Sequence, residues 1–374
     1  MRILIFSWRG PNHPHAGGAE ISTHEHAKGW VSAGHEVTLF TSSYRGAKSQ
    51  EFIDGVNIIR RGSQILGVHW EALIWYLFES HPKYDIVIDE FHGIPFFTPI
   101  YVRAKKLGFI HEVTKEVWAL NPWPKPFNLI PAIIGIICEP LIFKFFYKKI
   151  PFMTGSESAK KDLIFWGIPK NNITVIHHGL NPPKNQPTFP KEKTKTLIFL
   201  GALSRDKGIE DALRIFSILK NSGIDFQFWV VGKGEVNYLK YLKSLSHKLG
   251  LDKAVKFWGF ASEEKKYELL TKSHLLINPS VREGWGLVVV EAAWVGTPTV
   301  GYDVPGLRDS ILNRKTGLLC SPDPNTCSEA ILSLINDEKR YQIFRQNCFK
   351  WSKKFNWKKS STESLKLIEK LIHI

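Results

Sequence analysis

The sequence predicts an α/β protein made of two doubly wound domains. Its 374 residues are more than one hydrophobic core usually supports and fit two domains of similar size. Short apolar runs alternate with helical segments twice, once before and once after a proline-rich stretch. Glycine-containing turns follow several of these runs, at the strand ends where doubly wound sheets hold their ligands. We therefore expect two parallel sheets, each with a ligand-binding edge.

Composition narrows the choice of partner. Hydrophobic residues make up 43% of the chain and charged residues 23%, which is an ordinary globular mixture. The formal net charge of +15 favours an anionic partner, either a phosphorylated donor molecule or an acidic lipid surface. The chain shows no nucleic-acid-binding module and no concentrated basic arm, so we expect no nucleic-acid partner.

The cysteines and the first residues indicate the compartment. Four cysteines lack the paired spacing of zinc sites and disulfide frameworks, which suits a reducing cytosol and predicts no metal site. The opening apolar run is too short for a signal peptide and is better interpreted as the first strand. We expect a cytoplasmic protein.

The first domain begins with a strand, a glycine loop and a helix. A strand over residues 2–7 leads to Gly17 and Gly18, which open a helix that ends near residue 33, and the next strand covers residues 36–41. Two glycines at a helix N-terminus can hold an anion. The glycine spacing of a nicotinamide dehydrogenase is absent here.

Two histidines follow predicted strands further along. Residues 86–89 form one strand, and His92 lies just beyond it. A helix over residues 94–106 then leads to a short strand at 109–110, which is followed by His111. Carboxyl ends of parallel strands share one edge of a sheet, so we expect both histidines at the ligand edge.

A strongly apolar stretch runs from residue 121 to residue 151. Aromatic and branched aliphatic side chains dominate it, Pro131, Glu139 and Pro140 interrupt it, and Lys144, Lys148 and Lys149 lie near its end. The interruptions argue against a membrane span. Two interpretations stay open: a buried helical pair, or an interfacial segment with lysines at anionic headgroups. The basic net charge favours the second.

The proline-rich residues 181–195 form the predicted linker between the domains. We place the first domain at 1–180 and the second at 196–355, and a last helix at 356–374 is a candidate to pack back on the first domain. The second domain repeats the strand–helix alternation, with strands predicted at residues 196–200, 226–231, 255–258, 275–277 and 299–301.

A basic glycine turn follows the first strand of the second domain. Arg205 and Lys207 stand between Gly201 and Gly208, at the start of a helix. Cationic side chains at such a turn can neutralise a diphosphate. Gly232 marks a further turn at the end of the next strand.

The run from Asn278 to Ala293 is the strongest candidate for the active centre. A short strand ends at Asn278-Pro279-Ser280, two glycines follow, and a helix over residues 287–294 begins. Gly284 and Gly286 allow a ligand to approach the backbone, and the N–H groups of Leu287 and Val288 point out of a positive helix end. Glu283 precedes the turn, and Glu291 lies one turn into the helix. This arrangement fits a ligand whose diphosphate binds the helix N–H groups and whose hydroxyl groups hydrogen-bond to the two carboxylates.

The stretch Glu283-Gly-Trp-Gly-Leu-Val-Val-Val-Glu291 resembles the motif of the family 4 retaining glycosyltransferases. The resemblance extends over nearly the whole chain and implies the GT-B fold, two Rossmann-like doubly wound domains that face each other across a cleft. It assigns ribose binding to Glu291, a place beside the donor sugar to Glu283, and diphosphate binding to the amides of Leu287 and Val288. The residues assigned to donor binding are Gly17, Gly18, Arg205, Lys207, Gly232, Gly284, Trp285, Gly286, Leu287, Val288 and Glu291.

The same resemblance gives roles to residues of the first domain. His111 is expected to hydrogen-bond the donor sugar near the reacting carbon, and Gly17 and Gly18 to face the donor phosphates. His92 is a candidate for the acceptor side. The chain departs from the family where Ala202 replaces a common arginine and where His178 replaces the usual asparagine before a glycine.

The reaction implied by the resemblance is a retaining transfer of a sugar from a UDP- or GDP-sugar to an acceptor hydroxyl, without metal or other cofactor. The acceptor is expected to be a saccharide or lipid-linked molecule of polysaccharide or glycolipid synthesis, with an anionic membrane surface as a candidate partner. Two alternatives stay open: a sugar-nucleotide 2-epimerase and a non-catalytic protein that binds nucleotide sugars.

Overall fold

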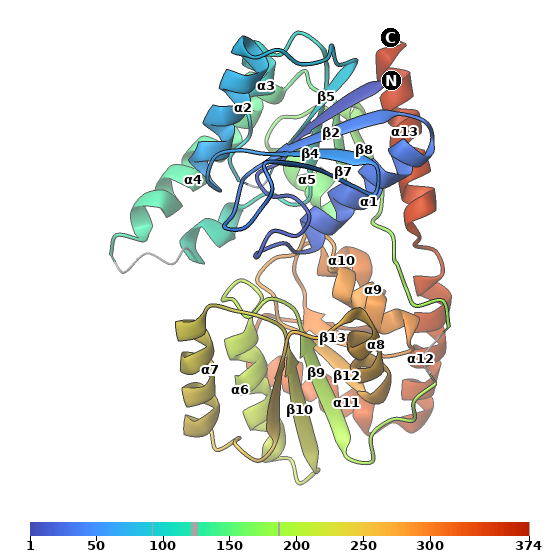
Figure 1. The fold of residues 1–374 in the computed structure, drawn as a ribbon. Coiled ribbons are helices and arrows are strands. Elements are labelled where there is room, and N and C mark those ends of the chain that lie inside the picture. The colour runs from blue at the N-terminus through green and yellow to red at the C-terminus, as the bar shows by residue number, and fades with distance from the viewer. Residues whose placement is uncertain (92, 121–125, 186–187, 374) are drawn as a thin grey trace. The chain divides into compact units, whose positions relative to one another are not determined.

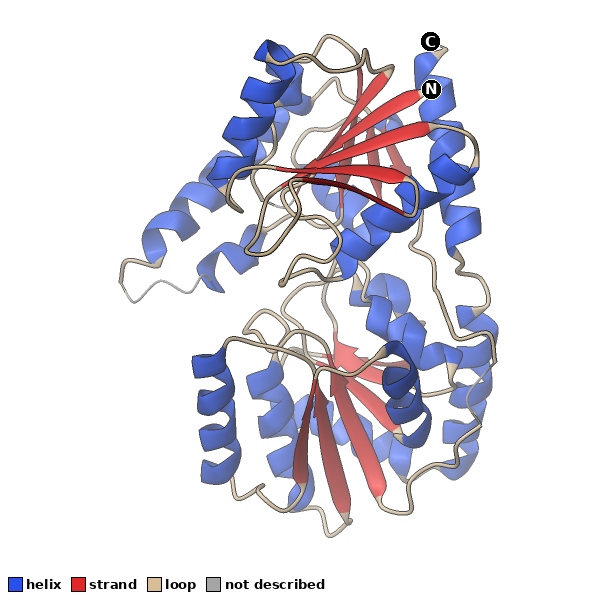
Figure 2. Cartoon of the chain, viewed as in Figure 1, coloured by secondary structure: helices blue, strands red, loops and turns tan. Residues whose placement is uncertain are grey.

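The computed structural model describes residues 1–91, 93–120, 126–185 and 188–373. The chain divides into two compact units, Met1–Gly179 with Asn356–Ile374, and Leu180–Phe355. It therefore passes from one unit to the other twice. Each unit has a largely parallel sheet with helices on both of its faces (Figures 1 and 2), which confirms the predicted doubly wound α/β architecture.

The first unit is built on an eight-stranded sheet of order β3-β4-β2-β1-β5-β6-β7-β8. Its strands are β1 (Arg2–Phe6), β2 (Glu36–Thr41), β3 (Gln50–Ile53), β4 (Val56–Arg60), β5 (Ile86–Phe91), β6 (Lys105–Ile110), β7 (Phe152–Thr154) and β8 (Ile173–Val175). All neighbours pair in parallel except β3 and β4, an antiparallel hairpin at one edge. The strand order reverses between β1 and β5, so ligands are expected at the carboxyl ends of these central strands.

Helices far apart in the sequence cover one face of this sheet. Helix α1 (Gly18–Ser32) packs beside the last helix, α13 (Trp357–Ile372), over the same buried cluster. The Ser364 hydroxyl accepts a hydrogen bond from Trp30 Nε1 at 2.9 Å and lies 2.9 Å from His26 Nδ1. Residues 356–373 are thus held in the first unit by buried contacts with α1.

The opposite face of the sheet packs against the segments between β4 and β8. These are α2 (Leu66–Phe78), α3 (Thr98–Tyr101), the 3-10 turn η1 (Lys115–Leu120), α4 (Leu129–Ile142), the π-helical turn η2 (Phe143–Tyr147), α5 (Glu157–Phe165) and the short turn η3 (Lys170–Asn172). Side chains of α2, η2 and α5 supply the two buried clusters of this face. The outer side of α4 stays exposed, so the apolar stretch does not form the buried helical pair considered above.

The second unit holds a six-stranded parallel sheet of order β11-β10-β9-β12-β13-β14. Its strands are β9 (Lys195–Leu200), β10 (Phe226–Val231), β11 (Val255–Gly259), β12 (Leu275–Asn278), β13 (Thr299–Tyr302) and β14 (Gly317–Cys320). Its helices are α6 (Ile209–Lys220), α7 (Val236–Lys248), α8 (Glu263–Lys272), α9 (Leu287–Trp294), α10 (Leu307–Ser310), α11 (Pro324–Ile335) and α12 (Glu338–Ser352). The switch point of this sheet lies between β9 and β12, its two central strands.

Part of the predicted linker packs on the second unit. The partly buried Lys191 donates from its ammonium to the Ser273 carbonyl at 2.5 Å and to Thr297 Oγ1 at 2.8 Å. The backbone N–H of Glu192 donates to the Lys272 carbonyl at 3.0 Å. These residues therefore run along the second unit as part of its surface.

The helix predicted over residues 94–106 is wrong for most of its length. Only the four residues of α3 are helical, and residues 105–110 form β6 beside β5. The cause is the buried Asp89, whose carboxylate accepts hydrogen bonds from the backbone N–H groups of Phe96 and Thr98. This interaction fixes the chain after β5 in a turn that a continuous helix could not follow. The β3–β4 hairpin and α2 were not predicted.

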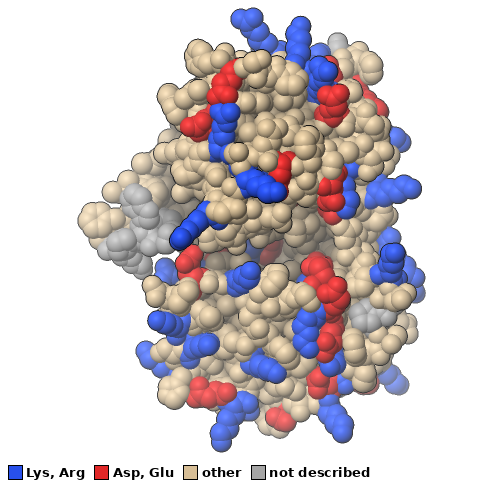
Figure 3. All heavy atoms as spheres, viewed as in Figure 1, with Lys and Arg blue, Asp and Glu red and all other residues tan. Residues whose placement is uncertain are grey.

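Charged side chains of both signs lie on each unit in the face that Figure 3 draws. On the face drawn in Figure 3, Lys and Arg alternate with Asp and Glu and do not gather in one basic stripe. On this face the net charge of +15 is therefore carried by scattered lysines and arginines.

The packing of the last helix generates a first prediction. Ile368 of α13 is fully buried in the cluster shared with α1. We expect Ile368→Ala to lower the unfolding free energy of the first unit by about 2–5 kcal/mol, because it removes buried methyl groups and leaves a cavity. Hydrogen exchange of the α1 amides should accelerate, while exchange in α6 of the second unit should not change.

Lys366→Ala is the matched control, because this exposed residue lies on the same helix. Unchanged exchange of α1 in Ile368→Ala would show that α13 does not stabilise the first unit.

Candidate functional site

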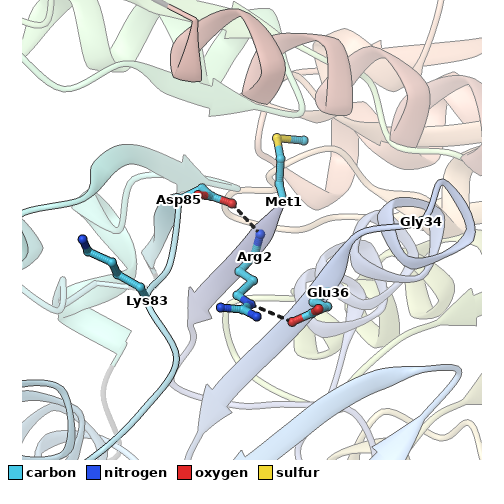
Figure 4. Close-up of a pocket in the computed structure, with 6 residues that line it drawn as sticks. All are labelled: Met1, Arg2, Gly34, Glu36, Lys83 and Asp85. Atoms are coloured by element: carbon cyan, nitrogen blue, oxygen red, sulfur yellow. Dashed lines mark hydrogen bonds and ion pairs between the residues drawn. The ribbon is translucent and has the colours of Figure 1, made fainter.

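A pocket of the first unit lies away from the predicted ligand edge. It has a volume of about 360 Å³ and is lined by Met1, Arg2, Gly34, Glu36, Lys83 and Asp85 (Figure 4). Arg2 spans it, with its backbone N–H donating to Asp85 and its guanidinium pairing with Glu36. These residues surround the amino ends of β1, β2 and β5, whereas parallel sheets bind ligands at the carboxyl ends. The functional site is therefore expected at the opposite edge of the sheet.

In the second unit, the loops after β9 and β12 meet at the switch point. Gly208 has φ of +71°, and a β-carbon there would overlap the Pro279 carbonyl oxygen. The backbone N–H of Val281 also donates to the Asp206 carbonyl at 2.8 Å. The glycine thus allows two loops from adjacent strands to touch backbone to backbone.

This contact brings together two predicted site residues. Lys207 Nζ donates to Glu283 Oε2 at 2.9 Å, and the Ser280 hydroxyl donates to Glu283 Oε1 at 2.8 Å. The side chain of Lys207 is 26% exposed and that of Glu283 12% exposed. A partly buried ammonium–carboxylate pair therefore lies at the switch point of the sheet.

The N-terminus of α9 lies three residues beyond Glu283. Gly286 begins the helix with φ of +82°, and no side chain caps it. Within the described ranges, the backbone N–H groups of Leu287 and Val288 have no hydrogen-bond partner. Unpaired N–H groups and the helix dipole make this end a site for an anion.

Glu291 points from α9 toward α8. Its Oε1 accepts a hydrogen bond from Lys266 Nζ at 2.7 Å, and Lys266 also pairs with Glu263 at 2.8 Å. Burial raises the pKa of Glu291, although the attraction of Lys266 opposes the rise. Burial works against the charge of Lys266, but Glu291 and Glu263 together hold the pKa of that lysine above its usual value.

Lys266 was not predicted as a site residue. It lies on a helix, outside any glycine turn, and only the distance to Glu291 reveals it. No partner for Glu291 Oε2 is found in the described parts of the chain, so this oxygen can accept a hydrogen bond from a hydroxyl group while Lys266 donates to Oε1.

Three predicted donor-binding residues take different positions. Arg205 is 60% exposed, and its nearest carboxylate oxygen, on Glu210, lies 3.9 Å away. The backbone of Gly232 lies against the Gly201 carbonyl, so this glycine lets the loops after β9 and β10 contact each other. Trp285 is only 2% exposed and packs edge-on against Phe355 at 5.2 Å between ring centroids. The Trp285 side chain therefore anchors the glycine turn in the core, and its assignment to donor binding stays a prediction.

In the first unit, His111 leaves β6 into a buried polar cluster. Its Nε2 lies 3.1 Å from Glu90 Oε1, and Thr23 donates to the same oxygen at 2.8 Å. Its Nδ1 lies 3.4 Å from His178 Nε2. Both ring nitrogens of His111 therefore have protein neighbours, and the residue is 5% exposed.

His178 connects this cluster to α1. Its Nδ1 lies 3.0 Å from the Ser22 hydroxyl, and a β-carbon at Gly155 would press on its ring. Burial, reinforced by the nearby His111 and His26, holds the pKa of His178 well below its usual value. A neutral His178 has one N–H donor and one acceptor nitrogen, so it can bridge Ser22 and His111. The departure from the family asparagine is thus accommodated by a hydrogen bond.

The glycine loop before α1 already binds the side chain of Glu20, a residue of the first turn of that helix. The backbone N–H of Gly17 donates to Glu20 Oε2 at 2.6 Å, and Arg9 Nε donates to Glu20 Oε1 at 2.7 Å. Hence only Gly18 and the residues after it have N–H groups left for an anion. Arg9, which was not predicted, adds a cation beside this loop.

The remaining expectations concern His92 and a metal site. His92 lies outside the described residues. In the described ranges, no group of three or more histidine, cysteine, aspartate or glutamate side chains is placed to hold a metal ion. Glu90, which was not predicted either, could have been noticed as a carboxylate at the end of a buried strand.

Two family models match the sequence, one on each half of the chain. The model described as Glycosyltransferase Family 4 matches residues 16–183. The model described as Glycosyl transferases group 1 matches residues 182–351 and includes the glycine turn and Glu291. Together the two matches extend over almost the entire chain in a single order.

Individual proteins agree with these matches. An uncharacterized glycosyltransferase of Methanocaldococcus jannaschii is 25% identical over 364 residues, which cover 90% of this chain and 90% of that protein. Sucrose-phosphate synthase from Thermosynechococcus elongatus superposes with a TM-score of 0.80 at 19% identity and covers 100% of this chain and 99% of its own. The Anabaena protein HepE, solved with UDP-glucose, superposes with a TM-score of 0.72 at 18% identity and covers 99% of this chain and 100% of its own. Both structures share the fold of the whole chain.

The loop contact at Gly208 can be tested against a second glycine. Gly223 has a similar φ of +79°, but a β-carbon there would meet no neighbouring atom. We expect Gly223→Ala to lower the unfolding free energy of the second unit by about 1–2 kcal/mol, the cost of a left-handed residue. Gly208→Ala should cost more and should increase hydrogen exchange in residues 279–286, because its β-carbon forces the two loops apart. Equal costs in the two variants, with unchanged exchange, would contradict the contact.

Acid is expected to destabilise the first unit through its buried histidines. Burial, with a smaller contribution from His111, lowers the pKa of His26 from 6.5 to about 3. The unfolded chain binds a proton on this residue below pH 6.5 and the folded chain does not, so stability present above that pH is lost as the pH falls. In His26→Gln, the loss of unfolding free energy between pH 7.5 and 5.5 should be smaller than in the parent by about 1.4 kcal/mol.

Urea unfolding of the first unit at the two pH values measures this difference. His373→Gln is the control, because His373 is exposed at the end of α13 and its removal should leave the pH dependence as it is. A parent-like pH dependence in His26→Gln would show that His26 is not held neutral.

Proposed function

The chain is a glycosyltransferase of the family 4 type with the GT-B fold, and from this premise we propose that it transfers a sugar from a UDP- or GDP-sugar to an acceptor hydroxyl with retention of configuration. The observation that carries the proposal is the group of side chains and amides at the switch point of the second unit. Lys207 lies on the loop after β9, and the unpaired amides and Glu291 lie on α9, which follows the loop after β12 in the same sheet. They match the parts of a nucleoside diphosphate sugar.

The diphosphate is proposed to bind at the N-terminus of α9. The N–H groups of Leu287 and Val288 would donate to its oxygens, and Lys207 would supply a full positive charge beside them. Arg205, which is more exposed, can add a second charge as the leaving group departs. Donors aimed at a charge that grows in the transition state lower the barrier more than they tighten substrate binding.

The ribose is proposed to bind Glu291. Its Oε2 can accept a hydrogen bond from a ribose hydroxyl, and Lys266 keeps the carboxylate oriented through Oε1. Glu263 holds Lys266 from the other side, so the three charged groups support each other. A ribose held by Glu291 would then position the attached diphosphate at the N-terminus of α9.

For the donor sugar we propose contacts with Glu283 and His111. Without ligand, Lys207 donates a hydrogen bond to Glu283 Oε2. When the diphosphate pairs with Lys207 instead, this oxygen would be free to accept a hydrogen bond from the sugar. At His111 the 3.4 Å contact with His178 is longer than the 3.1 Å contact with Glu90, so a sugar hydroxyl would replace His178. The glutamate would then keep the imidazole oriented during the exchange.

The chemical step needs no group beyond these. The bond from the anomeric carbon to the phosphate oxygen breaks, and the acceptor oxygen forms its new bond on the same face of the sugar. The proton of the acceptor hydroxyl passes to the phosphate oxygen that leaves. Cationic side chains and helix amides would stabilise the departing diphosphate, and so we propose a metal-independent reaction.

The donor class has support from a related fold. HepE binds UDP-glucose and superposes on nearly the whole of this chain. We propose a saccharide or a lipid-linked saccharide as acceptor, in polysaccharide or glycolipid synthesis on the cytoplasmic side of a membrane. Nothing in the described site favours a 2-epimerase or a non-catalytic binding protein.

Hydrolysis of nucleotide sugars in the presence of EDTA tests the proposal. The purified chain should slowly cleave one donor in a panel of UDP-, GDP- and ADP-sugars. Lys207→Ala should lower the rate of cleavage roughly a hundredfold, because it removes a charge that stabilises the leaving group. Glu291→Ala should weaken donor binding about tenfold or more, the loss expected for a hydrogen bond to a charged group.

Matched controls lie on the same unit. Lys272→Ala removes another salt-bridged lysine, and Glu329→Ala removes an exposed glutamate; neither should change the cleavage. NMR spectroscopy of the released sugar, before mutarotation, should show the configuration of the donor. Absence of both binding and cleavage for every donor would refute the proposal, and cleavage that EDTA abolishes would refute its metal independence.

A further inference from the structure

The segment Leu129–Tyr147 exposes an apolar surface of unusual extent. Ten large apolar residues in and beside α4 and η2 are between 43% and 71% exposed: Phe127, Leu129, Ile130, Ile133, Ile134, Ile136, Ile137, Leu141, Phe145 and Phe146. We call this set the apolar face. Single exposed apolar residues are common on soluble proteins, but contiguous groups of this kind mark surfaces that bind something.

The inner side of the same segment is fixed to the first unit. Ala132, Gly135 and Phe143 are buried, and a β-carbon at Gly135 would overlap the indole ring of Trp118. At the end of η2, the buried Tyr147 donates from its hydroxyl to Asp89 Oδ2 at 2.6 Å. The helix is therefore attached along its length and presents only its outer side.

A buried carboxylate in the middle of α4 strengthens this attachment. Glu139 accepts hydrogen bonds from the backbone N–H groups of Thr114 and Lys115 at 2.9 and 3.3 Å, and from Trp118 Nε1 at 2.9 Å. These partners belong to the loop that follows His111. Helix α4 thus fixes the loop that follows His111.

This attachment decides between crossing a membrane and lying on one. The 19 residues of Leu129–Tyr147, with mean hydropathy 2.0, are long and apolar enough to cross a bilayer. A crossing helix would have to leave the contacts of Glu139 and Tyr147 and carry a carboxylate into the hydrocarbon. Lying flat preserves every contact and buries only the apolar face.

The charges around the apolar face select the kind of lipid. Lys144, Lys148 and Lys149 are exposed at the C-terminal end of the segment. Between residues 126 and 150 the single acidic side chain is the buried Glu139. Every exposed charge of the segment is positive, which complements anionic headgroups.

We infer that the apolar face docks on an anionic lipid bilayer, with α4 parallel to the membrane plane and the three lysines at the headgroups. The inference deepens the proposed function and rests on it for its purpose, because a docked chain can reach an acceptor anchored in lipid. A second copy of the chain is the competing occupant, and the experiment below distinguishes the two.

Sedimentation with vesicles tests the docking. The parent chain should bind vesicles of phosphatidylcholine mixed with phosphatidylglycerol, and should bind pure phosphatidylcholine weakly. Ile133→Glu with Ile137→Glu should lower binding to the mixed vesicles at least about tenfold, because two carboxylates enter the apolar face. Exchange of the three lysines for glutamine should reduce binding to the mixed vesicles to the level of the neutral ones.

The matched control places two glutamates on exposed apolar positions of the second unit, Val236→Glu with Ile343→Glu, whose side chains are 68% and 56% exposed. This variant should bind vesicles as the parent does. Parent-like binding by the Ile133/Ile137 variant would overturn the inference. So would a parent chain that ignores all vesicles, or one that forms a dimer which the Ile133/Ile137 variant cannot form.

Donor cleavage in solution separates this inference from the proposed function. All variants should cleave the donor at the parent rate without vesicles, which also shows that they fold. Normal cleavage with no vesicle binding would reject the docking surface and leave the transferase. Vesicle binding with no cleavage of any donor would reject the transferase and leave the docking surface.

Discussion

The backbone contact between Gly208 and Pro279 is the constraint on which the site of the second unit depends. Loops that leave neighbouring parallel strands meet only if some residue lets their backbones approach, and here the missing β-carbon of Gly208 allows it. The contact gives Lys207 a fixed partner in Glu283, three residues before the glycine that begins α9. A cation, a carboxylate and a helix end thus share one small region because of a single residue without a side chain.

The two units handle charge in opposite ways. In the second unit the site residues are ion pairs, Lys207 with Glu283 and Lys266 with Glu291, which suits the binding of a charged diphosphate. In the first unit burial keeps His26 and His178 neutral around His111. Neutral imidazoles orient hydroxyl groups without attracting the phosphates. The candidate residues of the two units therefore differ in chemistry, with ion pairs in the second unit and buried neutral imidazoles in the first.

The sequence predicts the strands and the glycine turns of this fold well, and the partners of the site residues poorly. Helix α9 and strands β2 and β10 have the predicted bounds, because apolar periodicity and flanking glycines act locally. The segment after β5 was mispredicted, since the buried Asp89 captures its amides through tertiary contacts. Lys266 and the inward orientation of Trp285 likewise depend on neighbours far along the chain, which no local pattern reveals.

The pairing of Lys207 with Glu283 has a consequence for turnover. An enzyme that binds the leaving diphosphate with an unopposed lysine risks holding its product as firmly as it stabilised the transition state. Under the proposed function, Glu283 on its fixed loop would compete for the same ammonium, so each departure of the nucleotide would be matched by the return of an internal counter-ion. The proposed site would thus carry its own displacing anion, and a stronger ion pair would shorten the time that the spent nucleotide stays bound.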